Sequence, residues 1–488
     1  MFFKKQLYVP PQATLPYIPR IITDRAMYVY MAVLLICAVA FRHYIMSWYW
    51  WLFGIVEVCG FFYYSNVLTK QWCNYPAVTF QKRLFKTAFI IRLVYVVCSY
   101  VFYQMMTGKP FEFGSADAYI YHLTAQGFAD AIRNGTPRGI LDTLYIAYGT
   151  KLDLSDTGYP LYLGFVYLLT GNSILVARLL KALWSALTVV LVYKLAARTL
   201  GEKEARIAGI MCMLMPNLIY YCGIHLKETE MTFLIMLFVE RADYIMRRGK
   251  LTVFSTVGVM LVATSLFAFR TVVGAVLMLA FFGTMIFSST KVLKWGKRFL
   301  LMVVALAFIG VVVFQKTDIG NSVEEVWNTG GTEQKGNLEW RAQTNKFAKY
   351  AGAAVFAPMI FTIPFPSLVQ VGDQRNQLMI HGGNYVKNIL SGFTILALVL
   401  LLLSGDWRRH VLPLAVLCGY LVVLVFSNFA HSERFHLPVL PLLLMFAAYG
   451  ITRFRYLNLK RSYTYWTLIM LVAAIAWNWF KLAGRGMI

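Results

Sequence analysis

The sequence predicts an all-α fold, a polytopic bundle of transmembrane helices, and three observations support this prediction. Of the 488 residues, 59% are hydrophobic and 14% are charged, which is more apolar surface than one soluble core can bury. The apolar residues recur in runs about as long as a bilayer-spanning helix. The net charge of +24 is concentrated in short Lys/Arg clusters between these runs, which argues against a nucleic-acid-binding protein.

The apolar runs predict about 13 crossings, because a helix needs about 20 apolar residues to span the hydrocarbon core. They are expected near 26–41, 46–65, 84–106, 172–198, 207–223, 229–246, 251–269, 272–289, 299–315, 388–404, 411–428, 437–452 and 463–481. With a cytoplasmic N-terminus, every inner loop is basic, as the positive-inside rule requires. The basic residues of the inner loops are Lys70, Lys82, Arg83 and Lys86; Arg198, Lys203 and Arg206; Arg247, Arg248 and Lys250; Lys291, Lys294, Lys297 and Arg298; Arg408 and Arg409; and Arg453, Arg455, Lys460 and Arg461.

The predicted crossings divide the chain into four regions. Residues 1–83 form a basic N-terminal segment and a transmembrane hairpin, and 84–315 form a core that contains a first exported loop at 107–171. Residues 316–387 form a second exported loop, and 388–488 form the C-terminal transmembrane helices. The N-terminus is not expected to be a cleaved signal peptide, because its basic start is followed by Pro10 and Pro11 and then by Arg20, Asp24 and Arg25 before the first long apolar run.

Both exported loops contain apolar stretches of their own. In the first loop, the pattern from Ala116 to Ile132 predicts a helix, and G-Y-P-L-Y-L-G-F-V-Y-L-L-T at 158–170 predicts an interfacial or re-entrant helix because it is short and aromatic. The stretch 353–370 of the second loop contains three prolines, which exclude a regular span. Irregular backbone at membrane depth must lie against protein or water, so we expect this re-entrant segment to lie over a cavity.

Asp117 is the first candidate for chemistry, in the motif G-S-A-D-A-Y-I-Y-H. Ser115 can cap the predicted helix there, and Tyr121 falls one turn after Asp117 on the same face. A carboxylate near the membrane surface, flanked by Tyr121 and His122, can accept a proton from an acceptor hydroxyl. The alternative is a helix N-terminal carboxylate that complements the helix dipole, and the pattern alone does not separate the two.

Two shorter outer connections carry further charges. Lys227 and Glu228 lie in H-L-K-E-T-E between two apolar runs, where unpaired charges are costly and therefore indicate function. The alternative is an ordinary turn in which Lys227 and Glu230 snorkel to the surface. Arg270 is the charged residue of the short connection F-A-F-R-T-V-V-G. It is either an interfacial anchor or a phosphate ligand.

The densest polar cluster precedes the last but one crossing, in H-S-E-R-F-H-L-P-V-L-P. A permanently charged guanidinium next to a carboxylate suits a phosphate or pyrophosphate leaving group. The competing interpretation is a helix start with a surface Glu–Arg pair. The cluster consists of His431, Glu433, Arg434 and His436. Three charged residues inside apolar runs either line the same cavity, snorkel to the surface or pair with a neighbouring helix: Glu57, Arg178 and Lys181.

On four stretches the chain resembles the GT-C superfamily of integral-membrane glycosyltransferases, especially bacterial relatives of dolichyl-phosphate-mannose protein mannosyltransferases that use polyprenyl-phosphate sugars. The stretches are S-A-D-A-Y-I-Y-H, the run from G-Y-P-L-Y-L to A-R-L-L-K-A-L, L-K-E-T-E, and E-R-F-H-L-P-V-L-P-L-L-L. The resemblance extends over most of 84–452 and implies a GT-C-like bundle. It also implies inverting transfer of a sugar from a polyprenyl-phosphate donor to a lipid-linked glycan, a cell-surface polymer or an exported protein on the exported face.

The resemblance also implies roles for single residues. Asp117 would be the general base, and Arg434 would hold the lipid phosphate. Glu228 would be the second catalytic carboxylate, although many relatives have a single Glu followed by Pro where this chain has Lys227 and Glu228. The remaining residues expected to bind substrate or lipid phosphate are Lys227, Arg270, Glu433, His431, His436, Tyr121 and His122.

Neither a metal nor another cofactor is indicated. The first exported loop has no D-x-D motif, and the cysteines form neither a disulfide pattern nor a metal-ligand pattern. Arg and Lys can neutralise a leaving monophosphate without a divalent ion. The expected location is a bacterial inner membrane, with membrane lipids, the lipid-linked donor and the acceptor as partners, and no nucleic acid.

Two other functions remain open at this stage. An O-antigen-type polymerase or ligase also needs a long exported loop with Arg and His, but it does not need the Asp-Tyr arrangement of the first loop. A lipid-sugar flippase or secondary transporter would have ionisable residues deep in several helices, and a transporter built from inverted repeats would show internal repetition that this sequence lacks.

Overall fold

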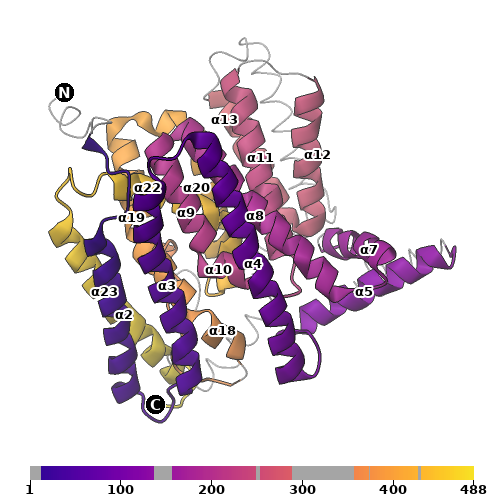
Figure 1. Ribbon diagram of the computed structural model, residues 1–488, viewed down its shortest axis with the longest axis horizontal. Helices are drawn as coiled ribbons and strands as arrows, with labels where there is room; N and C mark the ends of the chain where they lie inside the picture. Colours follow the sequence, from indigo (N-terminus) through magenta and orange to yellow (C-terminus); the bar gives the residue numbers. More distant parts are fainter. Residues whose placement is uncertain (1–12, 137–155, 249–252, 288–356, 373, 427–429) are drawn as a thin grey trace.

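The computed structural model describes residues 13–136, 156–248, 253–287, 357–372, 374–426 and 430–488 (Figure 1). Within these residues the regular secondary structure is helical, and the single β-bridge joins Ile45 to Val369. Seven helices are long and apolar enough to cross a membrane, so the prediction of an all-α polytopic bundle is confirmed. They are α2 (Arg20–Ala40), α3 (Trp48–Trp72), α4 (Ala77–Thr107), α8 (Ile174–Thr199), α19 (His381–Ser404), the span Glu433–Thr452 and α23 (Lys460–Ala483).

Further helices complete the bundle, and each predicted crossing within the described residues coincides with helical structure. The crossing expected at 299–315 lies outside the described residues. The further elements are α9 (Glu202–Leu214), α10 (Pro216–Tyr220), α11 (Glu228–Arg248), α12 (Val253–Phe269), α13 (Thr271–Phe287), α18 (Arg375–Met379) and α20 (Val411–Phe426). The crossing expected at 207–223 differs from the prediction, because α9 ends at Leu214, Met215 is extended, and Pro216 starts the separate helix α10.

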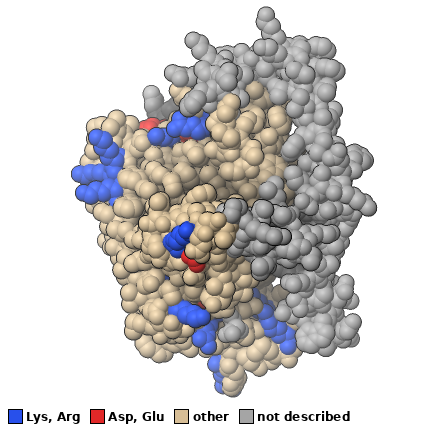
Figure 2. Space-filling view, turned by 90° about the vertical axis from the view of Figure 1, so that its right-hand side faces the viewer, with Lys and Arg blue, Asp and Glu red and all other residues tan. Residues whose placement is uncertain are grey.

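The interior of the bundle is formed by α8, α9, α11 and the helical span that starts at Glu433. Helix α8 packs against α4, α9 and α11, whereas α2 packs against α3 and α23 at one side of the molecule (Figure 1). In the apolar 18-residue window of the Glu433–Thr452 span, 94% of residues are buried, against 28% in the corresponding window of α4. Exposed apolar side chains on the outer helices are what a lipid environment allows, and on the face shown in Figure 2 Lys and Arg appear only as small separate patches.

Two helices project from the bundle beside the candidate site. They are α5 (Ala116–Arg133) and α7 (Gly158–Thr170), which pack against each other and lie at an angle to the long helices (Figure 1). Both coincide with the helical stretches expected in the first exported loop. Gly164 allows the close approach, since a Cβ at this position would lie 2.4 Å from the Phe128 ring. On α7, Phe165 and Leu169 are 57% and 88% exposed, as an interfacial helix requires.

The basic residues of α4 and the loop that leads to α5 lie at opposite ends of α4. This helix has 31 residues and is therefore about 46 Å long. Its first turns carry Lys82, Arg83 and Lys86, and it ends at Thr107, just before the loop that leads to α5. The bundle therefore has a basic end and, across its full length, the end that holds Asp117.

The proline-rich segment after residue 356 is irregular, as expected, and its described residues pack against α19 and α23. Asn478 of α23 accepts hydrogen bonds from the backbone N–H groups of Leu368 (2.7 Å) and Val369 (3.2 Å) and donates one to the Pro366 carbonyl (3.0 Å). Asn388 of α19 donates to the Pro364 carbonyl (3.0 Å). The side chains of two helices thus supply the hydrogen bonds that this backbone cannot make to itself. Residues 353–356 of the predicted segment lie outside the described residues.

We expect Asn478→Leu to destabilise the protein strongly. The substitution leaves two buried backbone N–H groups without acceptors, and each such group costs about 1–3 kcal/mol. Thermal unfolding of the purified protein in detergent measures the loss. The matched control is Val472→Ala, at a side chain of the same helix that is 62% exposed. Equal unfolding temperatures for the two variants would show that the segment does not depend on Asn478.

Candidate active site

An arginine joins two carboxylates at the end of the bundle opposite the basic clusters. Arg434 Nη1 lies 2.5 Å from Asp117 Oδ2, and Arg434 Nε donates to Glu228 Oε1. The three residues come from the first turn of α5, the start of α11 and the short helix α21 (Glu433–His436). A planar guanidinium suits this bridging role because its donors point in fixed directions.

Local sequence explains how each of the three side chains reaches this position. Pro438 and Pro441 divide the chain after α21 into a 3-10 turn (Leu437–Val439) and α22 (Leu440–Thr452), and prolines are tolerated in such first turns. Arg434 therefore lies on a short separate turn in front of a buried helix. Asp117 lies in the first turn of α5, where a carboxylate is favoured by the helix dipole. Ser115 occupies the cap position, but its side chain makes no capping hydrogen bond.

The two carboxylates differ in their access to water. The Glu228 side chain is 0% exposed, the Arg434 side chain is 19% exposed, and the Asp117 side chain is 53% exposed. Glu228 is thus enclosed and holds the arginine, whereas Asp117 is open to an incoming molecule. Within the described part of the chain, Arg434 Nη2 donates to no residue, so this nitrogen can still contact a ligand.

Asp117 and Arg434 line a cavity of about 350 Å³. Its walls are built from the loop before α5, from Tyr220 and Tyr221 of the α10 region, and from the Gln374–Gln377 segment that precedes α19. Glu433 lines the same cavity. A cavity of this size, with one accessible carboxylate and one guanidinium, is large enough for a sugar ring or a phosphate group.

Arg270 and Lys227 surround Glu228 on its buried side. Arg270 Nη2 lies 3.9 Å from Glu228 Oε1, and its guanidinium carbon lies 4.4 Å from the centre of the Phe435 ring. Lys227 is buried, donates to the Phe269 carbonyl at 2.7 Å and pairs with Asp156. Burial, together with the nearby Arg270, lowers the pKa of Lys227 well below its usual value. Lys227 thus faces the end of α12 and does not line the described cavity.

The structure does not bring the candidate histidines to this cavity. His436 Nε2 lies 2.8 Å from the Ala430 carbonyl oxygen, and the His431 ring packs against Trp477 with ring centres 6.0 Å apart. His122 Nδ1 lies 2.8 Å from the Tyr167 hydroxyl, on the side where α5 meets α7. Tyr121 is buried against Tyr159 at a ring-centre distance of 5.2 Å. These four residues support the shape of the site and do not form its walls.

A buried polar network behind the cavity includes groups that the sequence left undecided. Lys181 Nζ lies 3.2 Å from Glu230 Oε2 and 3.2 Å from the Tyr159 hydroxyl, so it links α8 to α11 and α7. Arg178, one turn earlier, donates to the Pro110 carbonyl of the loop before α5. Lys181 is thus paired across helices and Arg178 is bonded to a loop, and neither residue lines the described cavity.

Glu112, which is buried, and Glu57, which is partly buried, also make contacts that the sequence did not predict. Glu112 is 5% exposed, and its Oε2 accepts a hydrogen bond from the His225 backbone N–H at 3.4 Å. Burial raises the pKa of Glu112 above its usual value. In the sequence, the position of Glu112 between two phenylalanines was the feature that could have indicated its burial. Glu57 Oε2 accepts from the Gly383 N–H at 3.0 Å, so it caps the start of α19.

The described residues offer no obvious place for a metal ion. No group of three or more His, Cys, Asp or Glu side chains in the described ranges is arranged to hold one. The carboxylates at the site are paired with arginine, as in sites that neutralise a phosphate with side-chain cations.

The structure thus combines a helical membrane bundle with a carboxylate and an arginine that line one cavity. Residues 376–484 match the model of the Alg9-like mannosyltransferase family. The matched region contains α19, α20, α22 and α23, together with Glu433 and Arg434. No curated protein matches the chain. The match supports a membrane glycosyltransferase with a lipid-linked sugar donor, in agreement with the GT-C resemblance.

Proposed function

We propose that this protein is a membrane glycosyltransferase that moves a sugar from a polyprenyl-phosphate donor to a hydroxyl group of a glycan, lipid or protein acceptor. The observation that carries the proposal is the contact of Arg434 with both Asp117 and Glu228 at an open cavity. Asp117 is an accessible proton acceptor, and Arg434 is a cation held next to it. Sugar transfer from a phosphate ester to an alcohol requires both groups.

In the proposed reaction, Asp117 takes the proton of the acceptor hydroxyl. The hydroxyl oxygen attacks the anomeric carbon from the side opposite the phosphate, and a new carbon–oxygen bond forms. The bond from the anomeric carbon to the phosphate oxygen breaks, and its electron pair stays on the polyprenyl phosphate. Arg434 stabilises the negative charge on this leaving group, while Glu228 keeps the guanidinium in place. A single displacement of this kind inverts the anomeric configuration.

A buried arginine in the membrane does not by itself favour the transporter alternative. Arg92 of α4 is fully buried, and it donates to Ser185 Oγ (2.7 Å) and to the carbonyls of Cys212 and Met213 (both 3.0 Å). These bonds tie three helices together and leave little capacity for a transported ligand. The residue is a structural cross-link.

The direct test is reconstitution in lipid vesicles with a radiolabelled polyprenyl-phosphate sugar and a glycan and lipid extract as the acceptor. We expect release of polyprenyl phosphate that depends on the extract, with the label transferred to acceptor material of inverted anomeric configuration. Release of polyprenyl pyrophosphate from a pyrophosphate-linked glycan would instead identify a polymerase or ligase and would overturn the proposal.

We expect turnover to remain within about twofold of the untreated rate after chelation with EDTA, because Arg434 supplies the positive charge at the proposed phosphate position. The measurement compares initial rates before and after chelation and after addition of Mg²⁺ or Mn²⁺. A loss of turnover that either ion restores would show that a divalent cation takes part.

We also propose that the N-terminus lies in the cytoplasm of a bacterium and that the cavity opens on the exported face of the inner membrane. The support is the concentration of Lys and Arg at the opposite end of the bundle, including Lys82, Arg83 and Lys86 on the first turns of α4. Lipid-linked sugars and exported acceptors meet at that face.

A further inference from the structure

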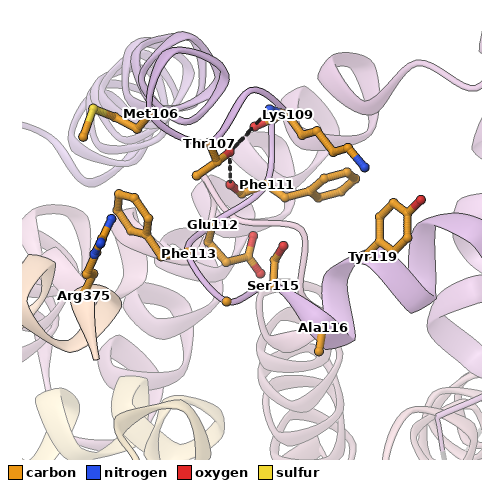
Figure 3. A pocket seen from close by; sticks show the side chains of 11 residues that line it. Met106, Thr107, Lys109, Phe111, Glu112, Phe113, Ser115, Ala116, Tyr119 and Arg375 are labelled. Atoms are coloured by element: carbon orange, nitrogen blue, oxygen red, sulfur yellow. Dashed lines mark hydrogen bonds between the residues drawn. The ribbon is translucent and has the colours of Figure 1, made fainter. Parts of the chain in front are cut away.

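A second cavity, of about 480 Å³, adjoins the one that holds Asp117 and Arg434 (Figure 3). The two cavities share residues 112–116, the loop that leads into α5. Asp117 follows this shared loop directly. A molecule bound in the second cavity therefore lies next to the proposed base without occupying the position of the donor phosphate at Arg434.

Two cations line the second cavity, and each lies over an aromatic ring. Lys109 Nζ is 4.8 Å from the centre of the Tyr119 ring, and the Arg375 guanidinium carbon is 5.4 Å from the centre of the Phe113 ring. Figure 3 shows them on two sides of the cavity, with Glu112 and Ser115 between. Cation–ring contacts restrict the motion of long side chains, so both charges are held near fixed positions.

The acid in this cavity is buried, whereas its two cations are exposed. Glu112 is 5% exposed, and its Oε2 accepts a hydrogen bond from the His225 backbone N–H, while Lys109 and Arg375 are exposed. The exposed charges in the lining of this cavity are thus positive. An anion of the acceptor is attracted to such a cavity, whereas a neutral sugar gains only ring stacking and neutral hydrogen bonds.

Exposed apolar side chains lie near this cavity in the chain. At the end of α4, Met105 and Met106 are 79% and 52% exposed, and on the outer side of α5, Ile120 and Leu123 are 46% and 47% exposed. Met106 also lines the cavity. Exposed methionine and branched apolar side chains beside a polar cavity suit an alkyl chain that enters from the bilayer.

We infer that this second cavity is the acceptor site and that Lys109 and Arg375 select an acceptor that carries a phosphate group on a lipid-linked sugar. The inference rests on the proposed function for the identity of the site as an acceptor site. The binding of a phosphorylated amphiphile, however, needs no turnover and can be tested by itself.

The probes are octyl glucoside 6-phosphate, octyl glucoside and glucose 6-phosphate, which differ only in the phosphate and the alkyl chain. Binding to the full-length protein in lipid nanodiscs is measured in the presence of saturating undecaprenyl phosphate, which fills the donor site. We expect octyl glucoside 6-phosphate to bind at least about tenfold more tightly than octyl glucoside, because only the former gains charge-assisted hydrogen bonds. Equal binding of these two probes would overturn the inference.

The variant that tests the residues is Lys109→Gln with Arg375→Gln. It is expected to weaken octyl glucoside 6-phosphate binding by about tenfold or more and to leave octyl glucoside binding and the thermal unfolding temperature unchanged. Arg83→Gln is the matched control, because Arg83 also lies over a ring, that of Tyr75 at 4.4 Å, but at the opposite end of the bundle. Unchanged affinity in the double variant would overturn the assignment.

The remaining outcomes distinguish a lipid-linked phosphate from a soluble one. They also distinguish failure of the acceptor site from failure of the proposed function. Glucose 6-phosphate that binds as tightly as its octyl derivative would contradict the lipid-linked part and indicate a soluble phosphorylated glycan. The protein could bind the octyl probe through Lys109 and Arg375 and yet release no polyprenyl phosphate from a polyprenyl-phosphate sugar. That result would support the anion site and reject the proposed function. Undecaprenyl phosphate that displaces the octyl probe would show that the two cavities hold one ligand and would overturn a separate acceptor site.

Discussion

Asp117→Asn is expected to lower turnover by about 10²- to 10⁴-fold, the usual range for loss of a general base. The amide keeps the size of the side chain and can still contact Arg434, but it cannot take the proton of an acceptor hydroxyl. Donor affinity should stay close to that of the wild type, since the phosphate is held by the arginine. The measurement is the release of polyprenyl phosphate at saturating donor, together with donor binding by the same purified protein.

The control for this variant is Asp130→Asn. Asp130 lies on the same helix, is similarly exposed at 46%, and is also paired with an arginine, Arg133 at 2.8 Å. Its substitution removes an exposed ion pair worth at most about 1 kcal/mol and should leave turnover unchanged. If Asp117→Asn turns over as fast as Asp130→Asn while both proteins fold, Asp117 is not the base.

Arg434→Ala is expected to abolish both donor binding and turnover. The variant loses the cation proposed to hold the phosphate, and it leaves Glu228 buried without its closest partner. Removing one member of a buried pair costs about 3–5 kcal/mol of folding stability, so a lower unfolding temperature is also expected. Donor affinity and unfolding temperature are both measured, because loss of folding alone would also abolish activity.

A double variant separates these two effects. Glu228→Gln in combination with Arg434→Ala removes the uncompensated buried charge and should restore most of the lost stability without restoring donor binding. Recovery of the unfolding temperature with no recovery of affinity is the predicted result. Wild-type donor affinity in either the single or the double variant would remove Arg434 from the phosphate site.

Much of the fold follows from hydrophobic length and charge alone. Runs of about 20 apolar residues are long enough to span a bilayer whatever their neighbours are, so most helices of the bundle were predictable one by one. The helices after Ser115 and Thr157 were also predictable, from their period and from their aromatic content. The break at Pro216 was missed because the apolar run continues through it, and hydropathy does not register a lost backbone N–H.

The site was predictable only in part. The distribution of Lys and Arg placed Asp117, Glu228 and Arg434 on one side of the membrane, although 317 residues separate the first from the last. That distribution does not say which groups touch, so the joining of both carboxylates by one arginine came from the packing of α5, α11 and α21. The histidines of the H-S-E-R-F-H motif were misleading, because the turn that directs Arg434 into the cavity directs His436 to a backbone carbonyl.

The buried network behind the site had a weaker signal. Arg178 and Lys181 are three residues apart in an apolar run, which places them on one face of a helix. Their partners, Glu230 and the Pro110 carbonyl, lie in other parts of the chain. Sequence position does not reveal such pairs, since they depend on how α8 packs against α11 and against the loop before α5.

The account depends most on Asp117 and Arg434 sharing one water-filled cavity on the exported side. Thiol labelling in intact cells tests this with Ser115→Cys and Ser432→Cys, which line that cavity beside the two residues. Native Cys73, at the basic end of the bundle, is the internal control in a background without the other cysteines. A membrane-impermeant maleimide is predicted to label both introduced thiols and to leave Cys73 unmodified until the membrane is opened. Labelling of the two introduced thiols from opposite sides would contradict the account.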